Sequence, residues 1–218
     1  MKVSSSIEDY LKNIYQLQEK EGLARTKKLA DRMQVSLGTI TNTVELLEKH
    51  ELIKHTRYKG VTLTAKGNRI ALDVIRRHRL TERLLTDILR MDWSNVHEIA
   101  CKLEHDINEE VIKPLGKILG HPKTCPHGNP IPTKCGGIIE DKTTPLMDLK
   151  PKEIGTIVKI AEEKSEVLRY LDSLGIELGT TIKVEKKIKE KNSEFLQLKD
   201  IDTPLSRKIA SSIWVRKR

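Results

Sequence analysis

The feature that most constrains the fold is the order of elements predicted for residues 5 to 73, where three helical segments precede two short strands. Ser5-x-x-Glu8 is a capping-box signature, and apolar residues recur behind it at helical spacing. The further predicted elements are helices at residues 26–33 and 39–50 and strands at residues 52–56 and 61–64. A helix, a short helix, a turn, a third helix and a hairpin are typical of a winged helix-turn-helix.

The third of these helices separates a buried stripe from an exposed face. At about 100° per residue, Ile40, Val44 and Leu47 fall on one side, whereas Thr41 and Asn42 lie off it. In a helix-turn-helix the start of this helix enters the major groove, while the second helix and the wing contact phosphates. Asn42 is suited to bidentate base reading. The predicted DNA-contacting residues are Thr26, Lys27, Lys28, Ser36, Leu37, Gly38, Thr39, Thr41, Asn42, Arg57, Tyr58 and Lys59.

Most of the excess positive charge falls on the same segment. The chain has 40 Lys and Arg against 31 Asp and Glu, a formal charge of +9. Residues 25 to 69 hold ten of these basic residues and four acids, a difference of +6. Basic side chains that only solvate a surface are the alternative. Their coincidence with a helix-turn-helix pattern instead favours contact with the phosphates of double-stranded DNA.

The rest of the chain divides into a helical block and a β-rich block. Helical periodicity continues from Val74 to about Leu119. It is broken by Met91-Asp92-Trp93-Ser94 and is predicted to end with Pro114 and the Gly120-His121-Pro122 turn. Five of the eight prolines then lie in residues 121 to 148, which predicts a loop and linker, and short strands with glycine turns predict a small barrel. The predicted fold is therefore mainly α with a small β domain. Its parts are residues 1–73, 74–140, a linker at 141–148, and 149–218.

Composition narrows the location of the protein. No apolar stretch approaches the roughly 18 residues of a transmembrane helix, and the first eight residues contain no apolar signal core. Three cysteines are an odd, small number for a secreted disulfide framework. We therefore expect a cytoplasmic protein with no membrane partner.

Potential metal ligands gather on one face of a predicted helix. They are His97, Cys101, Glu104 and His105. Their spacing of i, i+4, i+7 and i+8 places them within an arc of about 100°, which neither a core stripe nor a solvated face favours. His78 and Glu82, at i and i+4, share a face of the preceding helix. Imidazole, thiolate and carboxylate together suit Fe(II), Mn(II), Co(II), Ni(II) or Zn(II), while the thiolate disfavours Ca(II) and Mg(II).

A second set of potential ligands lies in the proline-rich region, where Cys125, His127 and Cys135 are separated by two and eight residues. This set could hold zinc, but it offers three ligands and no paired CxxC. A proline-braced surface loop is the interpretation that the sequence favours.

Several motifs together resemble one family, the diphtheria toxin repressor family of metal-dependent transcriptional repressors. They are Asp9-Tyr10-Leu11-x-x-Ile14-Tyr15-x-Leu17, His78-Arg79-Leu80-x-Glu82-Arg83-Leu84-Leu85, Val96-His97-Glu98-x-Ala100-Cys101-x-x-Glu104-His105 and Gly128-Asn129-Pro130-Ile131-Pro132. The last block, with Leu171-x-x-Leu174-Gly175-Ile176-x-x-Gly179, resembles the SH3-like domain of longer members and the protein FeoA. The resemblance covers the whole chain and implies a DNA-binding domain, a helical metal-binding and dimerisation domain and an SH3-like β-barrel.

The resemblance implies two metal sites per subunit. The primary site would use Asp9, Cys101, Glu104 and His105. The ancillary site would use His78, Glu82 and His97, completed by Glu162 or Glu163 of the SH3-like domain.

The identity of the metal depends on three positions. Asp9 resembles the manganese-responsive branch of the family, whereas Cys101 resembles the iron-responsive branch. Lys12 stands where the manganese branch would carry another carboxylate ligand. Because a thiolate is the more discriminating ligand, we favour Fe(II), with Mn(II) as the alternative.

In this interpretation the metal ties the first helix to the middle block. Without it, neighbouring carboxylates would repel and leave the DNA-reading helices loosely placed. With it, a homodimer would present two such helices to a palindromic operator of metal-homeostasis genes. The predicted dimer seam is an apolar set, with an intramolecular core as the alternative. Its members are Leu80, Leu84, Leu85, Ile88 and Leu89.

Two other classes of function compete with a repressor. A metalloenzyme would also place His, Glu and Cys around a metal, but the sequence contains no nucleophile elbow, P-loop or HExxH motif. An adaptor that recruits a partner through the SH3-like block is the second alternative, and no charge pattern singles out a face for it. We therefore predict that the protein is not an enzyme.

Overall fold

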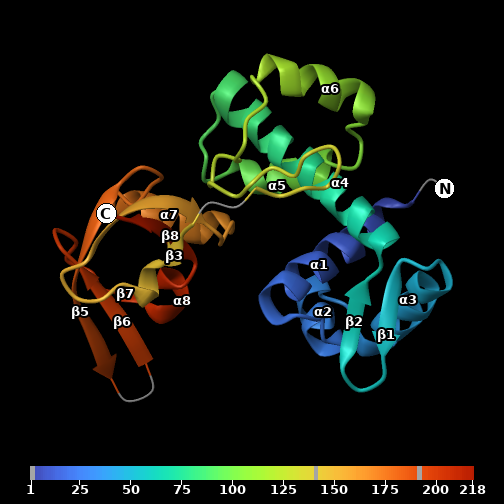
Figure 1. Ribbon diagram of the computed structural model, residues 1–218, viewed down its shortest axis with the longest axis horizontal. Helices are drawn as coiled ribbons and strands as arrows, with labels where there is room; N and C mark the ends of the chain where they lie inside the picture. The colour runs from blue at the N-terminus through green and yellow to red at the C-terminus, as the bar shows by residue number, and fades with distance from the viewer. Residues whose placement is uncertain (1–2, 140–141, 191–192) are drawn as a thin grey trace. The chain divides into compact units, whose positions relative to one another are not determined.

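The computed structural model describes residues 3–139, 142–190 and 193–218, which form two compact units (Figure 1). The N-terminal unit comprises Met1–His78, Glu104–Asn108 and Pro132–Gly137. The C-terminal unit comprises Arg79–Leu103, Glu109–Ile131 and Ile138–Arg218. Residues 140 and 141, where the predicted linker begins, lie outside the described residues.

The N-terminal unit contains three helices and a hairpin in the predicted order. They are α1 (Ser5–Glu21), α2 (Thr26–Met33), α3 (Leu37–Lys49), β1 (Ile53–Thr56) and β2 (Gly60–Leu63). The two strands are antiparallel, with Ile53 opposite Leu63. Ile40, Val44 and Leu47 are buried against α1 residues such as Leu11. The winged helix-turn-helix is thereby confirmed, and Figure 1 shows the hairpin projecting beside the helices.

The starts of α1 and α3 differ slightly from the prediction. The N-cap of α1 is Ser4, whose hydroxyl accepts from the Ile7 amide at 3.4 Å, so Ser5 is not the cap. Glu8 does not complete a capping box, because its carboxylate is engaged by charged side chains described below. The N-cap of α3 is Ser36, which accepts from the Thr39 amide at 3.1 Å, so α3 begins two residues earlier than predicted.

The middle helices follow the predicted periodicity, with a difference at Pro114. They are α4 (Ala65–Arg83), a π-helical turn η1 (Leu84–Ile88), α5 (Val96–Leu103) and α6 (Glu109–Ile118). Pro114 lies inside α6 and does not end it, whereas the end of α6 at Ile118 agrees with the predicted end at about Leu119. Proline removes one backbone hydrogen bond, and burial of Ile112 and Leu115 on the inner face sustains the helix to Ile118.

The C-terminal unit also contains a six-stranded antiparallel sheet among its described residues. Its elements are β3 (Thr144–Pro145), η2 (Leu146–Asp148), β4 (Ile154–Ile160), α7 (Ser165–Ser173), β5 (Thr181–Glu190), β6 (Ser193–Leu198), β7 (Leu205–Ser206), α8 (Arg207–Ala210) and β8 (Ile213–Lys217). The strand order is β3-β8-β4-β5-β6-β7. Leu146, directly after β3, and Leu205 of β7 belong to one buried cluster, although β3 and β7 are the two ends of the strand order. The sheet therefore curls around a single core, as the predicted small β domain requires.

Part of the predicted linker belongs to this sheet. Thr144 and Pro145 pair with Val215 and Trp214 of β8, and Leu146 is fully buried in the core. A proline is tolerated there because β3 is an edge strand. Among the described residues no helix combines the length and the apolar content needed to cross a membrane.

Candidate metal centres

A first group of ligand atoms lies in the N-terminal unit. Asp9 comes from α1, while Glu104 and His105 come from the turn after α5. His105 Nε2 lies 3.1 Å from Asp9 Oδ1 and 3.6 Å from Glu104 Oε1. We call these three residues the N-terminal cluster. Glu104 is fully buried and the Asp9 side chain is 42% exposed, so the cluster is open to solvent at Asp9.

Glu8 orients the imidazole of this cluster. Its Oε2 accepts from His105 Nδ1 at 2.7 Å, which leaves Nε2 directed at Asp9 and Glu104. Burial by itself lowers the pKa of His105, but the bond to Glu8 and the charges of Asp9 and Glu104 raise it on balance. A histidine held by a carboxylate through one nitrogen presents the other to a metal. This role of Glu8 was not predicted from the sequence, although its position next to Asp9 was an available signal.

The two carboxylates of the cluster have opposite pKa shifts. Burial raises the pKa of Asp9, and the opposing charge of His105 only partly offsets it. Burial alone would also raise the pKa of Glu104, but the hydrogen bond from His78 and the charge of Lys12 lower it on balance. A divalent cation at the cluster would favour the ionised form of both carboxylates.

Cations of the chain itself already compensate these carboxylates. Lys12 Nζ donates to both oxygens of Glu104, at 2.9 and 2.8 Å, and Arg77 bonds Glu8 Oε1 at 2.7 Å. Arg77 also donates to the Glu104 carbonyl at 2.5 Å. The expected repulsion between bare carboxylates is therefore wrong for this unit. The physical reason is that Lys12 pairs with Glu104 and Arg77 pairs with Glu8, and neither ion pair was predicted.

A second group of ligand atoms lies in the C-terminal unit. Donor atoms of Glu82, Cys125, His127 and Glu163 lie within 4.8 Å of one another, and we call these four residues the C-terminal cluster. His127 Nδ1 is 3.4 Å from Glu82 Oε1 and 3.9 Å from Cys125 Sγ. His97 Nδ1 borders the cluster, 3.3 Å from Glu82 Oε1 and 3.2 Å from Glu163 Oε2. Glu82, Cys125 and His127 are fully buried.

Backbone and amide groups hold this cluster in place. His127 Nε2 donates to the Trp93 carbonyl at 2.9 Å, so Nδ1 is the nitrogen that faces Glu82 and Cys125. Asn129 Nδ2 donates to Glu163 Oε1 at 2.7 Å. Gly128 has φ +81°, and a Cβ there would lie 2.1 Å from the Val158 carbonyl oxygen. The loop therefore approaches β4 so closely that only glycine fits.

Buried charge shifts the titration of this cluster. Burial lowers the pKa of His127, but its contacts with Cys125 and Glu82 raise it to about 11. Burial and the charge of Glu82 raise the pKa of Cys125. Without a metal these shifts favour protons on both the His127 imidazole and the Cys125 thiol. A metal would replace the proton on each of these two groups.

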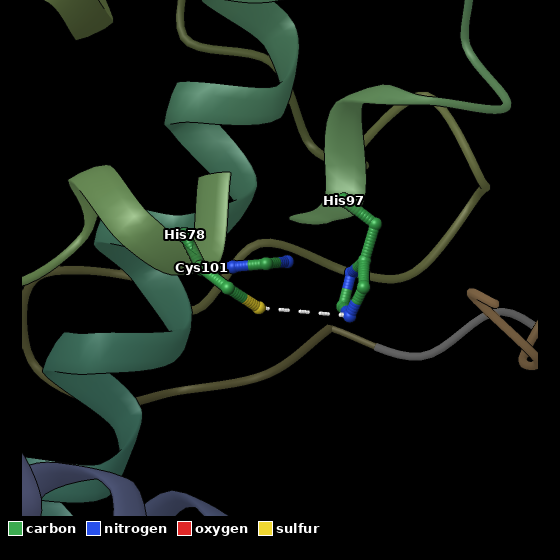
Figure 2. Close-up of side chains that lie close together, drawn as sticks. All are labelled: His78, His97 and Cys101. Atoms are coloured by element: carbon green, nitrogen blue, oxygen red, sulfur yellow. Dashed lines mark hydrogen bonds between the residues drawn. The ribbon is translucent and has the colours of Figure 1, made fainter. Parts of the chain in front are cut away.

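Cys101 lies on α5, one turn after His97 (Figure 2). Its Sγ is 3.7 Å from His97 Nε2, the contact drawn as a dashed line. His97 therefore faces Glu82 and Glu163 with one nitrogen and Cys101 with the other. His78, also labelled in Figure 2, comes from α4, one turn before Glu82 on the same face of that helix.

The donor sets fit divalent transition metals. The N-terminal cluster offers one imidazole and two carboxylates, a set common around Fe(II) and Mn(II). The C-terminal cluster adds a thiol, which suits softer ions of the same row. Glu8 accepts a hydrogen bond from His105 and Asn129 donates one to Glu163, and metal ligands are usually held by such bonds.

Comparison with known families covers nearly the whole chain. Residues 2–61 match the model of the iron dependent repressor N-terminal DNA binding domain. Residues 64–133 match the iron dependent repressor metal binding and dimerisation domain, and residues 144–217 match the FeoA domain. The diphtheria toxin repressor of Corynebacterium efficiens is 33% identical over 187 residues, which are 81% of each chain. This chain belongs to the diphtheria toxin repressor family.

Further members of this family show both the similarity and its limits. The iron-dependent repressor IdeR of Mycobacterium leprae is 40% identical over 125 residues, 57% of this chain and 54% of that protein. The match thus spans about half the length of that relative. A solved manganese-dependent transcriptional repressor in complex with manganese is 31% identical, with a TM-score of 0.83 over 97% of this chain and all of that one. These relatives are named as repressors, not as enzymes.

Some of the ligands that the family resemblance implied lie together in the structure, and one does not. Asp9, Glu104 and His105 come together, and Glu163 reaches His97 and Glu82. Within the described chain Glu162 joins none of the groups of potential ligand atoms. The assignment of these residues as ligands in this family member stays a prediction.

The proline-rich loop differs from its predicted surface position. Cys125 and His127 are fully buried, because the loop hydrogen-bonds to β4 through the Ile160 amide and the His127 carbonyl at 2.8 Å. Cys135, by contrast, is exposed. The sequence showed Cys125 and His127 as potential ligands, but nothing in it placed them beside Glu82 and Glu163.

The predicted DNA-contacting residues lie on open parts of the winged helix-turn-helix. On α3, Leu37, Thr41 and Asn42 are exposed. In the wing, Tyr58 is fully exposed at a turn with φ 63°. Lys28 on α2 forms an ion pair with Glu21 at 2.7 Å. In this repressor family the match of residues 2–61 to a DNA-binding domain supports the surface, and the individual contacts stay predictions.

Proposed function

We propose that this chain is an iron(II)-dependent transcriptional repressor. Its homodimer would bind a palindromic operator of metal-homeostasis genes in the cytoplasm when its metal sites are filled. The primary site would comprise Asp9, Glu104 and His105, joined by Cys101. The ancillary site would comprise His78, Glu82, His97 and Glu163, with Cys125 and His127 as additional buried ligands.

One observation carries this proposal. Asp9 belongs to α1, the first helix of the DNA-binding fold, and its carboxylate shares the N-terminal cluster with Glu104 and His105. These partners are separated from Asp9 by more than ninety residues of sequence. An ion bound by all three would restrict α1 and the helices packed on it. Metal concentration would then shift the population that is competent to bind DNA.

Donor chemistry supports iron. Two thiols, Cys101 and Cys125, lie next to histidines, and a thiolate favours Fe(II) over the harder Mn(II). Manganese is the second candidate, because the N-terminal cluster is rich in carboxylates and the manganese-dependent relative matches 97% of this chain.

Exposed apolar residues of the C-terminal unit support a homodimer. Ile88 and Leu89 of the predicted seam are 48% and 58% exposed, and Ile118 of α6 is 71% exposed. Leu80 and Leu85 are instead buried within the chain. The proposed seam therefore uses the end of η1 and α6 rather than the whole predicted apolar set.

DNA selection under controlled metal conditions tests the function. Duplexes that bind the protein would be selected from a random pool with anaerobic Fe(II), with Mn(II), or with a chelator. We expect dyad-symmetric sites with Fe(II) and loss of binding with the chelator. Asp9→Ala should lower the metal-dependent affinity by about 100-fold or more. Asp31→Ala, at an exposed position of α2, is the matched control.

Two outcomes contradict parts of the proposal. Binding that is indifferent to chelator and to Asp9→Ala would remove metal control altogether. Tighter binding with Mn(II) than with Fe(II) at equal free-ion concentration would replace iron by manganese.

A further inference from the structure

The side chain of Lys12 occupies a position that ligand atoms surround. Its Nζ lies 2.8 Å from Glu104 Oε2, 2.9 Å from Glu104 Oε1 and 3.4 Å from His78 Nδ1. The side chain is 10% exposed, on a residue type that is almost never buried without a partner. Two carboxylate oxygens and an imidazole nitrogen around one cation are the surroundings that a divalent metal ion would otherwise take.

Both oxygens of the Glu104 carboxylate have partners among cationic and imidazole groups. Its Oε2 contacts Lys12 Nζ and His78 Nδ1, at 2.8 and 2.6 Å. Its Oε1 also accepts from Lys12 Nζ, at 2.9 Å, and faces His105 Nε2 at 3.6 Å, within the N-terminal cluster. Because Oε1 faces His105 as well as Lys12, the carboxylate can bridge Lys12 and an ion held by Asp9 and His105.

We propose that the Lys12 ammonium acts as a resident cation of the N-terminal cluster and takes the place of a second divalent ion. The cluster would then bind one metal ion per chain, at Asp9, Glu104 and His105. This inference rests on the proposed function, because it requires metal at that cluster. It extends the proposed function by assigning Lys12 the control of how many ions bind and how tightly.

A resident ammonium has one consequence for metal affinity and another for Glu104 in the metal-free protein. A fixed ammonium next to Glu104 repels any divalent ion that approaches the same carboxylate, so it lowers affinity and raises the concentration at which the site fills. It also keeps Glu104 paired when no metal is present. Replacing the ammonium by a carboxylate would supply a new ligand next to Glu104 and His78.

Metal counting by native mass spectrometry, with competition titration for affinity, tests the role of Lys12. The probes are Mn(II), and Fe(II) under anaerobic conditions. Lys12→Glu should bind one more ion per chain than the natural sequence. Lys12→Gln should keep the natural count and bind its N-terminal ion at least about tenfold more tightly, while Lys12→Arg should behave as the natural chain. Lys20→Glu, at an exposed position on the same helix, is the charge-matched control.

The controls separate the possible failures. Asp9→Ala should remove one ion, and an unchanged ion count would overturn the proposed metal site itself. If that ion is lost but Lys12→Glu gains none and Lys12→Gln binds with natural affinity, Lys12 is only a structural ion-pair partner. Circular dichroism identifies any variant that fails to fold. If Lys12→Gln or Lys12→Glu is such a variant, the other one carries the test.

Discussion

The N-terminal and C-terminal clusters contain the same classes of ligand, imidazole and carboxylate, but different groups hold these ligands in place. The N-terminal cluster is open at Asp9 and is neutralised by long cationic side chains, Lys12 and Arg77. The C-terminal cluster is buried, and its His127 and Glu163 are held by the Trp93 carbonyl and by Asn129. Flexible side chains can move when a metal arrives, whereas a backbone carbonyl cannot. The comparison indicates that the first cluster is suited to respond to metal and the second is built into the fold.

The largest expected contrast between the clusters is in pH dependence. Metal binding at the C-terminal cluster must displace protons from His127, whose pKa is raised to about 11, and from Cys125, whose pKa is also raised. Affinity there should rise about 100-fold per pH unit between pH 6 and 8, since two protons leave. At the N-terminal cluster the raised pKa of His105 predicts one proton and about tenfold per unit, with the slope vanishing above that pKa.

Competition titrations at several pH values measure both slopes, with Asp9→Ala isolating the C-terminal cluster and Glu82→Gln isolating the N-terminal one. Equal slopes would remove this distinction between the clusters.

The stability of the metal-free protein should change with pH in the opposite direction to metal affinity. Because the folded pKa of His105 is raised, its contribution to stability is complete below its unfolded value of about 6.5 and is lost as pH rises through the folded value.

The next effect concerns the rigidity of the C-terminal cluster. Gly128→Ala adds a Cβ that would meet the Val158 carbonyl, at a backbone conformation with φ +81°. We expect a loss of about 2 kcal/mol in the free energy of unfolding, together with weaker metal binding at that cluster alone. Gly179→Ala has a similar φ of +88° but open space around the Cβ, so it should cost about 1 kcal/mol. Thermal unfolding with and without metal compares the two, and equal losses would show that the close approach to β4 is unimportant.

The smallest effect concerns the support of the N-terminal cluster. Glu8→Gln keeps the shape of the side chain but removes the charge that holds His105 Nδ1 and Arg77. Metal affinity at this cluster should fall by about tenfold, while the C-terminal cluster should be unaffected. Glu19→Gln, at an exposed position of α1, should change neither. An unchanged affinity in Glu8→Gln would mean that His105 is positioned without it.

Elements with strong local signals could be predicted from the sequence. The helical repeat of Ile40, Val44 and Leu47 and the basic turn at Tyr58 depend on neighbouring residues, and the structure reproduces both. The proposed pairing of Glu104 with His105 and Asp9 required the family resemblance, because Asp9 lies far away in the chain. Pro114 was misjudged because tertiary burial of one helix face outweighs the loss of a single hydrogen bond.

The sequence by itself determined the order of the elements, the concentration of positive charge on the helix-turn-helix, and the ligand types on one face of α4 and one face of α5. It did not predict that Glu104 and His105 lie in the turn after α5. The predicted features depend on backbone periodicity and side-chain chemistry, which act over a few residues. Only the tertiary structure decided that Cys125 and His127 are buried against Glu82, and that Lys12 pairs with Glu104. Those contacts join segments tens of residues apart through packing and through the need of buried charges for partners, and no local pattern encodes them.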